Sequence, residues 1–133
     1  MPIDRFLVTA LALSSVFAVA HAEEFTFVRE DACQSAHDAY GPDKIEVTTT
    51  EKETKVVGWV GVNCSIMLSK PSLSIEKHRV VVGVSAIFGD PNGPIAACNC
   101  TETFTMTFAG VVSDSTPVVL MVNGAQSATR DAL

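Results

Sequence analysis

The chain has 133 residues, of which 47% are hydrophobic, and a formal net charge of −6 at pH 7. Its length suits one compact domain behind a targeting segment. An acidic chain with no Lys/Arg cluster is repelled by phosphate backbones and anionic lipid, which argues against nucleic-acid and membrane-surface binding. The acidity is typical of a soluble secreted domain and also suits a cationic protein partner.

Residues 1–22 have the pattern of a secretory signal peptide. Arg5 supplies positive charge, an apolar run extends from Phe6 to Ala20, and Ala20-His21-Ala22 is a small-x-small cleavage site. The run is shorter than the ~20 residues that span a bilayer, and no second run of that length follows. We therefore predict an exported protein, in a bacterial periplasm, whose mature part is a single domain from Glu23 to Leu133 without a membrane span.

The mature chain reads as short alternating or β-branched segments separated by turn residues, which predicts about seven strands. Asp31 to Tyr40 is the exception, because its helix formers follow an acidic N-cap residue and stop at Gly41-Pro42. We predict an all-β, antiparallel sandwich or small barrel with one short helix near the mature N-terminus. The predicted strands are Glu23 to Arg29, Ile45 to Thr50, Lys55 to Val62, Asn63 to Ser69, Arg79 to Phe88, Ala97 to Gly110, and Pro117 to Val122.

Several details depend on turn residues and strand faces. Lys70-Pro71-Ser72 is predicted to break a strand, and the turn formers from Gly89 to Pro94 predict a long hairpin between the strands on either side. Apolar residues on both faces of Lys55 to Val62 predict a strand covered on both sides. Asn123-Gly124 is expected to begin a polar tail that frays.

The segment from Ala97 to Gly110 has the clearest alternation in the chain. Four threonines occupy one face of this predicted strand, and the other face is mostly apolar. Because successive side chains point to opposite faces, the apolar set is expected to face the core. That set is Cys98, Cys100, Glu102, Phe104, Met106 and Phe108.

Four cysteines, Cys33, Cys64, Cys98 and Cys100, lie in the mature part. In an exported domain an even number favours disulfides, here two bridges with three possible connectivities. The Cα atoms of residues i and i+2 of a strand are ~6.5–7 Å apart, near the upper limit for a bridge. We therefore predict that Cys98 and Cys100 bond separately to Cys33 and Cys64.

An alternative interpretation makes Cys98 and Cys100 soft ligands of copper or zinc, completed by His37, His78 or methionines. Two cysteines do not complete a tetrahedral zinc site, and the chain has no HExxH pattern or His-rich tract. Structural disulfides, surface histidines and core methionines are the favoured interpretation, so no metal and no cofactor are expected.

Catalysis has little support in the sequence. There is no Gly-x-Ser-x-Gly motif, and Glu102 is a single inward carboxylate rather than an acid–base pair. It is expected at the rim of the core or paired with Arg79 or Lys77 across the predicted hairpin. We therefore expect a non-enzyme.

The sequence thus predicts a small, disulfide-stabilised, exported binding or accessory protein that acts through protein–protein interaction. The alternative is a periplasmic copper- or zinc-binding protein that uses the Cys98/Cys100 pair. Rigid loop tips at Gly89 to Pro94 and Gly41-Pro42 are candidate binding surfaces. The segment Phe25 to Arg29 is a candidate exposed edge strand that could pair with a second chain.

Overall fold

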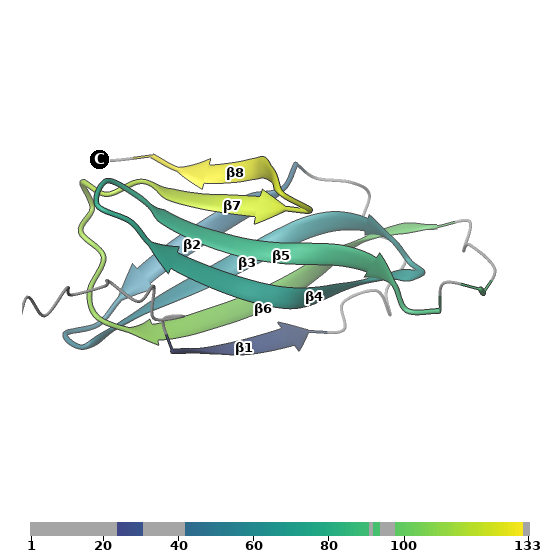
Figure 1. Cartoon of the computed structure of the whole chain (residues 1–133), viewed down its shortest axis with the longest axis horizontal. Coiled ribbons are helices and arrows are strands. Elements are labelled where there is room, and N and C mark those ends of the chain that lie inside the picture. Colours follow the sequence, from purple (N-terminus) through teal and green to yellow (C-terminus); the bar gives the residue numbers. More distant parts are fainter. Residues whose placement is uncertain (1–23, 31–41, 91, 94–97, 132–133) are drawn as a thin grey trace, which may run out of the picture.

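A computed structural model describes residues 24–30, 42–90, 92–93 and 98–131. They form eight strands in two packed sheets of four, so the predicted all-β sandwich is confirmed. Figure 1 shows one sheet in front of the other. The short helix predicted between Asp31 and Tyr40 lies outside the described residues. Within the described ranges, no helix has the length and apolarity that crossing a membrane requires.

The first sheet has the order β1-β6-β3-β2 and is antiparallel throughout. β6 lies between β1 and β3, so the alternating strand singled out in the sequence is central and has a partner on each side. Its apolar face is buried, whereas its threonine face points outward and is half-buried. The strand bounds are β1 Phe25–Glu30, β2 Lys44–Thr49, β3 Glu53–Asn63 and β6 Asn99–Ala109.

The second sheet has the order β4-β5-β7-β8. β5 and β7 are parallel, so the sheet is mixed and the prediction of a wholly antiparallel architecture is wrong here. The predicted hairpin is also wrong, because β5 pairs with β4 and β7 while β6 belongs to the other sheet. Turn residues specify where a chain reverses but not which sheet the next strand joins. The bounds are β4 Ile66–Ile75, β5 Val80–Phe88, β7 Val118–Val122 and β8 Ala125–Arg130.

The inner faces of both sheets form the core. Phe104 and Met106 of β6 are fully buried, and the Phe104 ring stacks on Phe27 with ring centroids 5.4 Å apart. Gly58 of β3 lies directly under the Phe104 ring, where a Cβ atom would overlap it. A glycine at this position therefore allows the largest core side chain of β6 to pack against the neighbouring strand.

β3 is covered on one face only, contrary to the prediction. Val56, Val60 and Val62 are buried, but Trp59 on the opposite face is half-buried. The Nζ atom of Lys44 lies 4.3 Å from the centroid of the Trp59 ring, which covers part of that ring with a cation–π contact.

The predicted strand break and the predicted fraying tail are also wrong. The segment at Lys70 and Pro71 is a bulge within β4, between Ser69 and Ser72, with Lys70 at φ 47°. Since β4 is an edge strand, a proline without an N–H is tolerated there. The expected fraying tail is β8, because Asn123 and Gly124, both at positive φ, form a tight turn between β7 and β8.

Candidate functional site

The disulfide prediction is supported at one pair. Cys64 and Cys98 are bonded, with Cα atoms 5.6 Å apart, and the Cys64 N–H donates to the Cys98 carbonyl at 3.0 Å. Cys100 is also disulfide-bonded, and no cysteine among the described residues is a free thiol. Cys33 lies outside the described residues. In this structure Cys98 and Cys100 therefore offer no thiolate to copper or zinc.

The residues of the alternative metal interpretation are not brought together within the described part of the chain. His78 is exposed in the turn between β4 and β5, at the end of the sandwich opposite the start of β6, where Cys98 and Cys100 lie (Figure 1). His37 falls outside the described ranges. Within those ranges, no group of three His, Cys, Asp or Glu side chains is placed to hold a metal ion.

Glu102 is buried, with 2% of its surface exposed, so the alternation of its strand predicts its inward face correctly, but the expected place at the rim of the core is wrong. Its Oε2 atom accepts a hydrogen bond of 2.9 Å from the Leu68 N–H on β4, and its Oε1 atom lies 3.4 Å from Nη1 of Arg29 on β1. This carboxylate therefore links the two sheets on the side where β1 and β4 face each other.

The predicted pairing of Glu102 with Arg79 or Lys77 is wrong, because those residues belong to the turn before β5, in the other sheet. Arg79 instead donates from Nε to Oε2 of Glu76 at 2.6 Å. This hydrogen bond, with the attraction of the carboxylate, raises the pKa of Arg79 above its ordinary value.

Three of the four edge strands in the described part of the chain carry features that hinder pairing with another chain. β4 contains a proline and a bulge, both of which interrupt the ladder of an added strand. β2 lies against β8: Asp43, just before β2, accepts from the Gly61 N–H at 2.8 Å and from the hydroxyl of Ser127. Ser127 is the extra residue of a bulge in β8. Asp43 therefore ties the start of β2 to β8.

β1 is the fourth edge, as the sequence suggested for Phe25 to Arg29. Its six residues pair with β6 in continuous register, without a proline or a bulge, and no described strand pairs with its other side (Figure 1). Val28 at its centre is 59% exposed. Half of the backbone N–H and C=O groups of such an edge point away from the sheet and can pair with another strand.

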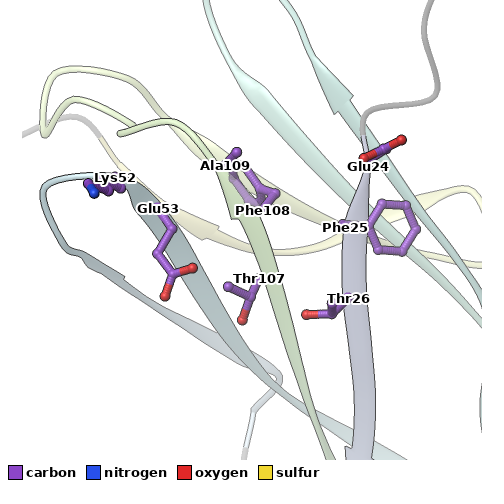
Figure 2. Close-up of a pocket in the computed structure, with 8 residues that line it drawn as sticks. All are labelled: Glu24, Phe25, Thr26, Lys52, Glu53, Thr107, Phe108 and Ala109. Carbon is purple, nitrogen blue, oxygen red and sulfur yellow. The ribbon is translucent and has the colours of Figure 1, made fainter.

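A shallow groove of about 720 Å³ begins beside the start of β1. Figure 2 shows Thr26, Thr107 and Glu53 projecting from three neighbouring strands on the outer side of the sheet. Thr26 and Thr107 are cross-strand partners, and Glu53 pairs with Ala109, two residues further along β6. Carboxylate and hydroxyl oxygens on one surface can accept hydrogen bonds from a cationic or amide group.

The sequence indicated the edge but not the groove. Alternation in β1 was enough to place Thr26 and Val28 on one face, whereas the groove depends on Thr107 and Glu53, which come from distant parts of the chain. Their proximity follows from the strand order and register, which no local signal specified. Comparisons with protein-family models, with curated proteins and with solved structures found no match for this chain.

Proposed function

We propose that this is a small exported, disulfide-stabilised binding protein that acts through protein–protein interaction, by accepting an extended segment of its partner along β1. The observation that carries the proposal is the regular edge of β1, along which no described strand pairs, with Val28 exposed at its centre. In this mode of recognition, backbone hydrogen bonds give affinity and alternate side chains give specificity.

The contrast among the edges supports β1 as the binding strand. An exposed, regular edge invites unwanted association, so folded proteins usually interrupt or cover it. Here β4 is interrupted by the bulge at Lys70 and Pro71, and the β2/β8 side is joined by Asp43 and Ser127. β1 has no proline and no bulge, and the ion pair that joins its side of the sandwich lies on its inner face, through Arg29. Its six residues offer roughly 20 Å of regular strand at about 3.4 Å per residue.

The proposed location is supported by two features of the chain. Residues 1–22 have the signal-peptide pattern, and the Cys64–Cys98 bridge belongs to the chemistry of oxidising compartments such as the bacterial periplasm. The proposal assigns no catalytic step. Glu102, the buried carboxylate of the described residues, accepts a hydrogen bond from Leu68 and pairs with Arg29 inside the sandwich.

Site-specific photocrosslinking in the exporting cell tests the proposal. A crosslinking amino acid replaces Thr26 or Val28 on β1 and, as a matched control, Glu46 or Thr48, which are exposed on the edge strand β2. We expect covalent adducts with one partner from positions 26 and 28 alone. The crosslinked partner residues should lie two apart in an extended segment, because strand pairing fixes the register.

Adducts of equal yield at all four positions, or none at positions 26 and 28, would refute binding along β1. Adducts at positions 26 and 28 that map to scattered sites of the partner would refute strand addition.

A further inference from the structure

We infer that the segment accepted by β1 is cationic: an extended stretch of a protein partner in which Lys or Arg side chains flank an apolar one on the outward face. This inference rests on the proposed function, since it names the chemistry of the segment that would lie along β1.

The first support is the charge of the outward face of β1. Glu24 and Glu30 stand at its two ends, with Thr26 and the exposed Val28 between them. The positive charge of the strand is on Arg29, which points to the inner side and pairs with Glu102. An added strand therefore meets carboxylates at both ends of the outward face and an apolar side chain between them.

The charges on β1 determine which side chains are favoured at the opposing positions of an added strand. Directly opposed side chains of adjacent strands lie close enough for opposite charges to attract and for like charges to repel. The partner residues opposite Glu24 and Glu30 are therefore Lys or Arg, and the residue opposite Val28 is apolar. A segment with Asp or Glu at the two flanking positions is disfavoured.

The groove gives the second support. Glu24, Thr26 and Thr107 line the part of the groove nearest the edge, so a long cationic side chain opposite Glu24 would lie beside these oxygen atoms (Figure 2). Lys52, which also lines the groove, and Lys55, which opposes Thr107 from β3, lie on the side away from β1. The part of the groove nearest the edge is thus lined by hydrogen-bond acceptors and negative charge.

A second copy of this chain fits the edge poorly. In antiparallel pairing of two β1 strands centred on Phe27, Glu24 of each copy would face Glu30 of the other, and like charges directly opposed are destabilising. The formal net charge of −6 adds general repulsion between copies. A basic segment of another protein removes both obstacles.

Two synthetic probe peptides test the inference on the exported protein with its disulfides formed. In both peptides, Thr and Val oppose Thr26 and Val28 of β1. The two residues that oppose Glu24 and Glu30 are Lys in one peptide and Glu in the other. Fluorescence anisotropy at low and at 0.2 M salt gives their affinities. We expect the Lys peptide to bind about tenfold more tightly, with a smaller difference at the higher salt concentration, because salt screens exposed charges.

Matched charge variants show which carboxylates favour binding of the Lys peptide. The double variant E24Q/E30Q should weaken binding of the Lys peptide several-fold, while E46Q/E51Q, which removes the same charge from exposed positions at and next to β2, should leave it unchanged. Equal loss in both double variants would overturn the inference, since it would indicate net charge rather than the β1 edge.

The remaining outcomes separate the two proposals. If the Glu peptide binds as tightly as the Lys peptide and both are blocked by V28K, the cationic inference is wrong and strand addition stands. If crosslinking at positions 26 and 28 yields no adduct, the proposed function is wrong. If position 28 crosslinks to a second copy of this chain and sedimentation shows a dimer, self-pairing replaces the cationic segment.

Discussion

Thr54 offers a sharp test of how the end of the sandwich near the groove is held together. This β3 residue is fully buried, and its hydroxyl serves two backbone groups of the segment after β6. The Oγ1 atom donates to the Gly110 carbonyl at 2.7 Å and accepts from the Val112 N–H at 3.0 Å. Replacing the hydroxyl by a methyl group in T54V removes both hydrogen bonds at nearly constant volume.

The expected loss of stability depends on how exposed the two backbone groups are that lose their hydrogen bond to Thr54. Val112 is buried, so its N–H loses a partner and cannot bond to water instead. Leaving such a donor unsatisfied lowers the free energy of unfolding by about 1–3 kcal/mol. Gly110 is exposed, so its carbonyl can bond to water and adds little. The matched control T54S keeps the hydroxyl and loses one methyl group, which costs about 0.8 kcal/mol. We therefore expect T54V to be about 2 kcal/mol less stable than the parent, and T54S less affected.

Urea unfolding monitored by Trp59 fluorescence measures both variants. We expect a lower midpoint with an unchanged dependence on urea concentration, which marks a change in stability rather than in the extent of unfolding. If T54V is as stable as the parent, or more stable than T54S, the hydroxyl does not hold this segment and the reasoning from hydrogen bonds is wrong.

Three further variants test the core and the bridge by the same urea measurement. E102A should cost about 1–3 kcal/mol, because it removes the acceptor of the Leu68 N–H and the partner of Arg29, whose side chain is 29% exposed. E102Q keeps an acceptor and should cost less; equal losses would refute a role for the acceptor. G58A should cost about 1–3 kcal/mol, because the added Cβ meets the ring of the fully buried Phe104; an unchanged midpoint would show that the ring can move away. The double variant C64S/C98S should lose about 4 kcal/mol, as the chain-entropy account gives for a bridge with a sequence separation of 34; a loss below about 1 kcal/mol would contradict that account.

Local pattern was enough to predict much of the fold. The alternation of β6 placed Phe104, Met106 and Glu102 in the core, and the burial of all three follows that pattern. A period of two residues decides which face a side chain occupies whatever the strand order. The distance argument against a bridge between residues i and i+2 likewise directed Cys98 toward a distant cysteine, and Cys64 is its partner.

The strand order was not contained in local pattern. The turn after β5 predicted a hairpin with β6, but β5 pairs in parallel with β7, and the partners assigned to Glu102 failed for the same reason. The effect of Pro71 could not be predicted locally either, because it depends on whether the strand is central or at an edge. The groove beside β1 required the register of three strands and could not be predicted from any one of them.

Amide hydrogen exchange of the exported protein, alone and with the Lys peptide, tests strand addition along β1 most directly. Strand addition gives backbone partners to the β1 amides that point away from β6. The account predicts slower exchange of amides within Phe25–Glu30 when the peptide is bound, and no change within Lys44–Thr49 of β2. Binding that leaves β1 exchange unchanged, or that slows both edges equally, would contradict it.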